Sequence, residues 1–311
     1  MVTEAIVVPV IDLTNFPAEL EKLAVAATDL GCFRIVNHGI PPTLMAEMKA
    51  IVASLFDIPA EAKLRNFVDL IHEGGYVSPA RLSRLFESFG IYDATSPADV
   101  HSFCSALDAS PKQHEIIIDY VSRLHAVAMN IASRVAESLG LAGRSFNEWA
   151  CHVRLNSCNF KEQEDIGYIS IPAHTDFNFL TVLQEDECAN GFEIMDVNGN
   201  FVAIDPVPGT FLVNIGDLGK VWSNGRMHNV THRVVCKEAM PRFSMALLIL
   251  APKSGEIEPD TSFIDGKHPK MYKAVNYKEH RKLRITSGLM AAEFLSRLKI
   301  DHQEIVTSDL I

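Results

Sequence analysis

Eight short segments in the second half of the chain alternate apolar and polar residues and are separated by turn signals. The turns include Asn190-Gly191 and Pro208-Gly209, dipeptides that favour tight reversals of the backbone. Short, evenly spaced strands cannot bury an apolar face alone, so they pair into a closed or double-layered sheet, as in a jelly roll. The expected strands cover residues 152–159, 171–176, 180–184, 192–196, 201–205, 211–215, 230–236 and 242–250.

The first 150 residues mix helix and strand patterns. Apolar residues at helical spacing predict helices at 18–30, 43–55 and 111–139, and β-branched runs predict strands at 7–13 and 32–40. We therefore expect a mixed α and β chain that forms one compact enzyme unit. It has an N-terminal region at 1–150 with a loop-rich substrate segment near 66–110, a catalytic core at 151–252 and a helical tail at 253–311.

The composition argues against several classes of protein. A formal net charge of -11 disfavours binding to nucleic acid or to an anionic membrane surface. The most apolar run, residues 243–251, is too short to span a bilayer. The six cysteines form no C-x-x-C pair, which favours buried thiols in a reducing compartment over a cysteine zinc site. We expect a cytoplasmic protein with a small-molecule substrate; the sequence does not predict its oligomeric state.

A metal site is predicted from His174-Thr175-Asp176. One H-x-D is expected by chance in a chain with 12 histidines, and such a histidine is usually solvated or a structural hydrogen-bonding group. In a strand, however, residues two apart point to the same side, so His174 and Asp176 can reach one ion. His232 is the preferred third ligand because it lies mid-strand, and His228, which has the same parity, is its rival.

Arg242 and Ser244 are predicted to lie beside this site. If residues 237–241 form a hairpin turn, His232 faces Ser244 across it, and Arg242 points to the same side. A register shift of one residue would remove this arrangement, and Arg242 would then be an ordinary surface arginine. Two histidines and one carboxylate leave three positions open on an octahedral ion, as in iron(II) oxygenases. An Arg-x-Ser pair suits the far carboxylate of a dicarboxylate cosubstrate.

These motifs together resemble those of plant 2-oxoglutarate- and iron(II)-dependent dioxygenases. The resemblance covers nearly the whole chain and implies a double-stranded β-helix (jelly-roll) core flanked by helices. It implies that His174, Asp176 and His232 bind Fe(II). It also implies that Arg242, Ser244 and Asn156 bind 2-oxoglutarate and that ascorbate is the reductant. The matching segments are 9–13, 31–39, 55–59, 174–176, 214–217, 223–226, 232–234 and 242–244.

Within that superfamily the chain is most similar to the dioxygenases for auxin oxidation. The phrases that carry this similarity are 44–49, 91–93, 103–104, 107–110 and 222–226. The resemblance implies oxidation of indole-3-acetic acid, or of its amino-acid conjugates, to the 2-oxindole, coupled to decarboxylation of 2-oxoglutarate to succinate. One position departs from the family pattern: Cys158 stands where a tyrosine usually contacts 2-oxoglutarate, and a thiol is a poor donor.

An indole acid needs a flat apolar slot and a cationic or hydrogen-bonding group for its carboxylate. The candidate substrate-binding residues are aromatic or basic and lie in the irregular segment or beside the metal ligands: Tyr76, Arg81, Arg84, Phe86, Phe177 and Phe179. Each could equally be an ordinary core aromatic or a solvated arginine.

Three other functions compete with this hypothesis. The chain could be an oxygenase of the same superfamily acting on a gibberellin, a flavonoid or another small acid. It could be a cupin-like metalloenzyme that uses no 2-oxoglutarate, although Arg242 and Ser244 argue against that. It could also be a non-catalytic small-molecule-binding jelly roll, although a binder has no need for open positions on iron.

Overall fold

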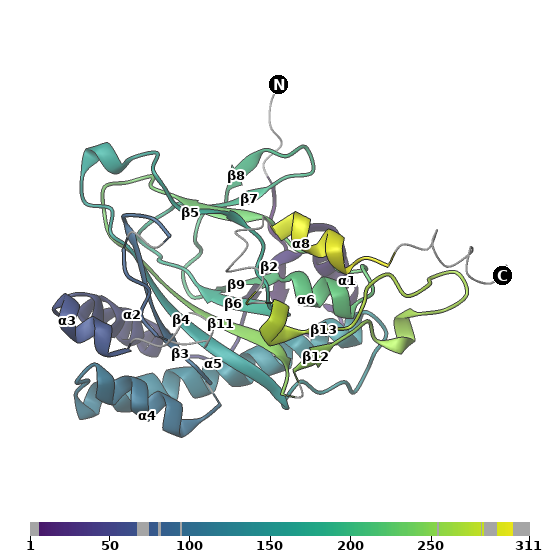
Figure 1. Cartoon of the computed structure of the whole chain (residues 1–311), viewed down its shortest axis with the longest axis horizontal. Coiled ribbons are helices and arrows are strands. Elements are labelled where there is room, and N and C mark those ends of the chain that lie inside the picture. The colour runs from purple at the N-terminus through teal and green to yellow at the C-terminus, as the bar shows by residue number, and fades with distance from the viewer. Residues whose placement is uncertain are drawn as a thin grey trace.

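The computed structural model describes residues 6–66, 75–79, 82–93, 95–253, 255–280, 282 and 291–300. Two sheets form the centre of the fold (Figure 1). The major sheet has seven strands in the order β1-β2-β9-β6-β11-β4-β3, and the minor sheet has four in the order β5-β10-β7-β8. The predicted fold class, a mixed α and β chain with a jelly-roll core, is confirmed.

The strand boundaries agree closely with the alternation in the sequence. Strands Leu180–Gln184 and Phe211–Ile215 match the prediction at both ends. The major sheet contains β1 (Val10–Asp12), β2 (Cys32–Val36), β3 (Phe86–Ile91), β4 (Trp149–Cys158), β6 (Leu180–Gln184), β9 (Phe211–Ile215) and β11 (Arg242–Pro252). The minor sheet contains β5 (Ile169–His174), β7 (Phe192–Met195), β8 (Phe201–Ala203) and β10 (His232–Val235).

Helices cover the outer face of the major sheet (Figure 1). The longest, α5 (Pro111–Ser138), begins with a capping box in which Ser110 and Gln113 satisfy each other's backbone N–H groups. Tyr120 of α5 donates a hydrogen bond to Gln184 of β6 at 2.8 Å, which fixes the helix on that face. The other helices are α1 (Leu20–Val25), η1 (Ala26–Leu30), α2 (Pro42–Phe56), α3 (Ala60–Lys63), η2 (Leu64–Asn66), α4 (Pro97–Ala106), η3 (Gln163–Asp165), α6 (Asp217–Trp222), η4 (Thr261–Phe263) and α8 (Ala291–Leu298).

The opposite, inner face of the major sheet is polar along its centre. Ser244 of β11 pairs with Asn156 of β4, which pairs with Ser88 of β3. Residues directly opposite in antiparallel strands point to the same side, so these three side chains share one face. Because the same register places Thr181 opposite Leu248 on β11, Thr181 lies on that face as well. The inner face therefore presents a row of hydrogen-bonding groups toward the minor sheet.

The structure differs from the sequence prediction in four details. β10 and β11 do not form a hairpin: β10 pairs with β5 and β7, whereas β11 pairs with β4 and β6. Residues 66–110 are more regular than expected, because they contain β3 and α4. The tail that follows residue 253 contains a small antiparallel pair, β12 (Glu256–Ile257) and β13 (Val275–Asn276), besides α8. The N-terminal region also supplies three strands, β1, β2 and β3, to the major sheet.

No helix in the described part of the chain combines the length and the apolar character that a bilayer span requires.

Candidate metal centre and cosubstrate clamp

His174, Asp176 and His232 come together at one end of the minor sheet. His174 ends β5, His232 begins β10, and the two residues are directly paired across the sheet. The Nε2 atoms of both histidines lie 3.7 Å from Oδ1 of Asp176. One ligand atom from each residue lies within 4.8 Å of the other two, so a single ion can be held by all three. This spacing is somewhat wider than the roughly 3 Å expected between neighbouring ligands around a bound transition metal.

The backbone fixes which nitrogen of each histidine faces the ion. Nδ1 of His174 lies 2.8 Å from the carbonyl oxygen of Pro172, and Nδ1 of His232 lies 3.3 Å from that of Val230. A carbonyl oxygen can only accept, so each ring donates its Nδ1 proton, and Nε2 is the nitrogen that can bind a metal. These contacts therefore orient both rings so that Nε2 faces Asp176.

Thr181 orients the carboxylate of Asp176. Its hydroxyl donates to Oδ2 of Asp176 at 2.6 Å, which turns the other oxygen, Oδ1, toward the two histidines. Asn178 donates its side-chain amide to the same threonine oxygen at 3.1 Å. Asp176 follows the end of β5 and does not lie within the strand, so these contacts, and not strand geometry, place it beside His174.

A buried carboxylate supports the metal-binding segment from behind. Asp217, at the start of α6, accepts hydrogen bonds from the Thr175 hydroxyl at 2.6 Å and from the Asn229 amide at 2.8 Å. Its backbone N–H donates to the carbonyl of Asp176 at 2.8 Å. Gly216 lies so close to this segment that an added Cβ would meet the carbonyl oxygen of Asn178 at 2.0 Å. The chain from Thr175 to Asn178 is therefore held tightly against α6.

Arg242 is a buried cation on the inner face of the major sheet. It is 3% exposed, and its Nε atom has no hydrogen-bond partner among the described residues. The neighbouring carboxylate of Glu185 forms an ion pair with Arg34. Two guanidinium groups therefore act on one carboxylate, and the Nε of Arg242 is left without a partner among the described residues. Burying such a charge is costly unless an anion pairs with it, so the site suits a carboxylate ligand.

Ser244 and Asn156 lie next to Arg242 on the same face. Asn156 donates a hydrogen bond to the Ser244 hydroxyl at 3.4 Å and accepts one from Ser88 at 2.8 Å. Cys158 pairs directly with Arg242 and occupies the place of the usual tyrosine. Burial raises the pKa of the Cys158 thiol, although Arg242 acts in the opposite direction. The thiol therefore stays protonated and unreactive.

The predicted substrate-binding residues lie in different parts of the fold. Phe86 pairs with Cys158 and shares its face, so it lies on the inner side of the sheet. Phe177 follows Asp176, and its ring lies 5.9 Å from that of Tyr277. Arg84 is bound to Asp165 at 2.7 Å and stacks on Tyr168.

Two other candidates lie away from the metal. Tyr76 donates a hydrogen bond to Glu87 at 2.6 Å and packs on Phe89, on the helix-covered side of β3. Phe179 is fully buried among Phe146, Trp149 and Trp222. Arg81 lies outside the described residues.

Several supporting residues were missed by the sequence prediction. Thr181 could have been found from strand parity, since it is a polar residue in a predicted strand and lies on the inner face. Arg154 shares the face of Asn156, two residues away on β4, and donates to the carbonyl of Gly75 at 3.1 Å. Nothing in the sequence marks Asp217 as a partner of Thr175, because the contact joins residues far apart in the chain.

Family models match two parts of the chain. The 2OG-Fe(II) oxygenase superfamily model matches residues 149–251, which contain all three candidate ligands and the Arg242–Ser244 pair. A second model, the non-haem dioxygenase in morphine synthesis N-terminal region, matches residues 8–105. A 2-oxoglutarate-dependent dioxygenase DAO from Oryza sativa subsp. japonica is 48% identical over 281 residues, covering 90% of this chain and 93% of that protein. The chain belongs to the 2OG-Fe(II) oxygenase superfamily.

Solved structures of this family share the fold of the chain. A crystal structure of the dioxygenase for auxin oxidation in rice has a TM-score of 0.87 at 46% identity and covers 94% of this chain and 100% of that one. The dioxygenase for auxin oxidation 1 from Arabidopsis thaliana, in a binary complex with 2-oxoglutarate, has a TM-score of 0.80 at 42% identity. That match covers 85% of this chain and 100% of the Arabidopsis chain.

The donor set of this chain fits the cofactors of the family. Two neutral imidazoles and one carboxylate are the ligands that non-haem iron(II) sites use, with positions left open for other ligands. The unpaired Nε of Arg242 fits the far carboxylate of 2-oxoglutarate.

Proposed function

We propose that this protein is an iron(II)- and 2-oxoglutarate-dependent dioxygenase that oxidises the auxin indole-3-acetic acid, free or conjugated to an amino acid, to its 2-oxindole. The observation that carries the proposal is the histidine–carboxylate triad together with a buried arginine whose Nε has no partner among the described residues, in a chain 48% identical to a rice dioxygenase DAO. We also propose that the protein is cytoplasmic, because six free cysteines, five of them buried, are typical of a reducing compartment. Ascorbate is the proposed reductant.

Each residue of the site has a defined part in this proposal. His174, Asp176 and His232 hold iron(II), and Thr181 keeps one oxygen of Asp176 directed at it. Bound iron, dioxygen and 2-oxoglutarate together supply the oxidising chemistry, with 2-oxoglutarate converted to succinate and carbon dioxide. The protein supplies position, charge and exclusion of water.

Arg242, Ser244 and Asn156 are proposed to bind the far carboxylate of 2-oxoglutarate. A guanidinium offers two parallel N–H donors, which match the two oxygens of a carboxylate. Ser244 and Asn156 lie beside it on the same face and already contact each other. Cys158 cannot replace the missing tyrosine hydroxyl as a strong donor, so these three residues carry the recognition.

The substrate is proposed to lie on the inner face near Phe86, Phe177 and Arg154. Phe86 and Phe177 offer apolar surface for an indole ring. Arg154 is flanked on its two neighbouring strands by Gly90 and Ala246, which leave space above the sheet. Its charge would pair with the substrate's carboxylate.

The test is substrate-stimulated formation of succinate. Purified protein with iron(II), ascorbate and 2-oxoglutarate is supplied with indole-3-acetic acid, with its aspartate and glutamate conjugates, or with gibberellin and flavonoid controls. We expect succinate and a 2-oxindole product only with the auxins. Succinate formed only with another acid would support the proposed reaction type but would rule out auxins as the substrates. No stimulated succinate with any acid would favour a binding protein.

A pair of histidine variants tests the metal assignment. His174→Ala should lose iron and stimulated turnover, whereas His228→Ala should retain the iron content of the natural protein, because His228 lies outside the ligand group. Equal iron content in the two variants would show that the ligand set is wrong.

A further inference from the structure

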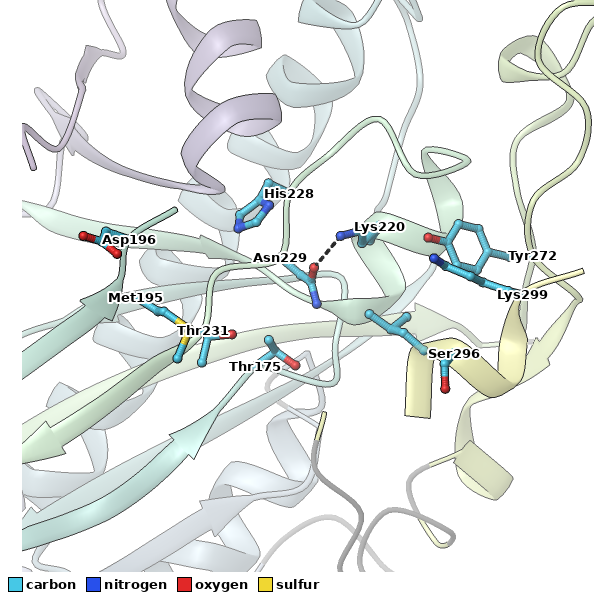
Figure 2. A pocket seen from close by; sticks show the side chains of 11 residues that line it. Thr175, Met195, Asp196, Lys220, His228, Asn229, Thr231, Tyr272, Ser296 and Lys299 are labelled. Atoms are coloured by element: carbon cyan, nitrogen blue, oxygen red, sulfur yellow. Dashed lines mark hydrogen bonds between the residues drawn. The ribbon is translucent and has the colours of Figure 1, made fainter. Parts of the chain in front are cut away.

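A cavity lies behind the segment that carries the candidate metal ligands (Figure 2). None of His174, Asp176, His232 and Arg242 lines it. Its volume is about 310 Å³, and it lies between α6, the end of β7 and the segment that leads through α8. Thr175 and Asn229 lie on its inner side. The Thr175 side chain reaches back to Asp217, whereas His174 and Asp176 on either side of it form the metal site. The cavity therefore does not open on the ion.

Two lysines from distant parts of the chain meet at this cavity. Lys220 comes from α6 and Lys299 from the end of α8, where a backbone bridge joins Lys299 to Tyr272. In Figure 2 the Tyr272 hydroxyl and the Lys299 amine point toward Lys220, whose own amine is turned to Asn229. Within the described residues neither lysine is paired with a carboxylate; Lys220 donates one hydrogen bond to Asn229 at 2.9 Å. An ammonium group has three donors, so two remain for a ligand.

Burial and a second positive charge disfavour the charged form of Lys220. Burial lowers the pKa of Lys220, Asp217 acts in the opposite direction, and the nearby charge of Lys299 lowers the pKa further. Asp196 lines the cavity and Asp217 acts on Lys220, but hydrogen bonds hold both carboxylates to other groups. Asp217 accepts from Thr175 and Asn229, and Asp196 accepts from the backbone N–H groups of Asn198 and Asn200, each at 2.8 Å.

We propose that this cavity is a second ligand site, which binds a small organic acid through its carboxylate. Lys220, Lys299 and the Tyr272 hydroxyl supply the positive charge and the donors. Met195, Leu295 and the Tyr272 ring supply apolar walls, which a bare inorganic ion would leave uncovered. The volume is at the lower end of the range for small-molecule sites, which limits the ligand to a compact acid.

The site is joined to the metal segment by hydrogen bonds. Lys220 bonds Asn229, and Asn229 and Thr175 both bond Oδ1 of Asp217. Lys220 is at one end of this series of hydrogen bonds, and Thr175, which lies between His174 and Asp176, is at the other. A carboxylate that draws Lys220 away from Asn229 would therefore act on the segment that carries the candidate metal ligands. Ligand binding also ties α6 to the segment that ends in α8.

The test is calorimetric titration of the iron- and 2-oxoglutarate-loaded protein with benzoate, without oxygen, and in parallel with inorganic phosphate. We expect one benzoate per chain, with the dissociation constant raised roughly tenfold in Lys299→Met and in Lys220→Met, since each variant removes one charge-assisted hydrogen bond. Lys299 is exposed, so its replacement does not threaten folding. Lys273→Met, an exposed lysine on the neighbouring segment and outside the cavity, is the matched control and should bind benzoate normally.

Three results would overturn the proposal. Equal benzoate affinity in the natural protein and in both lysine variants would place the binding elsewhere, for instance in the substrate pocket. Binding of phosphate but not benzoate would reject an organic acid as the ligand. Displacement of benzoate by excess 2-oxoglutarate would assign it to the Arg242 site. Because the titration measures no turnover, its outcome is independent of which substrate the iron site oxidises.

Discussion

Replacing Arg242 with methionine should make the ligand-free protein more stable and, at the same time, abolish tight binding of 2-oxoglutarate. The guanidinium is 3% exposed, and its Nε lacks a hydrogen-bond partner among the described residues. Replacing a buried, poorly paired charge by an apolar side chain of similar length stabilises proteins by about 1–4 kcal/mol. Losing one partner of a buried charge pair with the cosubstrate costs about 2–5 kcal/mol, which is roughly 30- to 5,000-fold in affinity.

Arg34 provides a control of the opposite sign. It lies on the same face of the major sheet and is equally buried, but it is paired with Glu185. Arg34→Met would leave that carboxylate buried without its strongest partner, so we expect a loss of about 3–5 kcal/mol in the free energy of unfolding. The two variants thus distinguish an arginine that stabilises the fold, Arg34, from one that binds a ligand, Arg242.

Two measurements check this pair of variants. Urea unfolding of the metal-free proteins gives the stabilities, and equilibrium dialysis with labelled 2-oxoglutarate and iron(II), without oxygen, gives the affinities. If Arg242→Met is less stable than the natural protein, or if it binds 2-oxoglutarate with near-normal affinity, Arg242 is a structural residue and the proposed clamp is wrong.

Three further predictions concern single contacts. Thr181→Val should weaken iron binding about 10- to 100-fold with little change in unfolding, because Asp176 loses its orienting hydrogen bond; metal analysis after dialysis against a chelator measures this. In the native protein iodoacetamide should modify the exposed Cys188 and spare the buried Cys158, whose pKa is raised; peptide mass spectrometry after brief labelling would contradict this if Cys158 reacted first. Burial lowers the pKa of His38 from its ordinary value of 6.5, and its neutral ring accepts from the N–H of Ile40. The stability it adds is therefore present above that pH and lost as pH falls below it, so melting temperatures between pH 7.5 and 5 should fall less steeply in His38→Gln than in the natural protein.

Local patterns in the sequence predicted most of this fold, because alternation and helical spacing record which face of each element is buried. The strands β6 and β9 and the helix α5 needed no long-range information. The pairing of β10 was predicted wrongly, because the turn at residues 237–241 does not reveal whether the chain stays in one sheet or crosses to the other. Parity still placed Ser244 correctly on the inner face, since alternation along β11 holds whichever strand it pairs with.

The residues that support the candidate metal ligands could not be predicted in this way. Asp217 supports Thr175 from 42 positions along the chain, and that contact depends on how α6 packs against the metal-binding segment. Tyr76 shows the reverse error, since an aromatic residue in an irregular segment suggested a substrate contact, whereas its hydroxyl is bound to Glu87 on the helix side of β3. Side-chain chemistry alone does not tell on which side of a sheet a loop residue packs.

The two halves of the candidate site belong to different sheets: the metal ligands extend from the minor sheet, and Arg242 and Ser244 from the major one. A chain whose sheets have not yet packed together therefore has neither the clamp nor a placed Asp176, because Thr181, which orients that carboxylate, belongs to β6 of the major sheet. Oxidising chemistry becomes available only after the sandwich has closed, when the substrate can also be enclosed. The reaction thus depends on how the two sheets pack against each other as much as on the residues that each sheet carries.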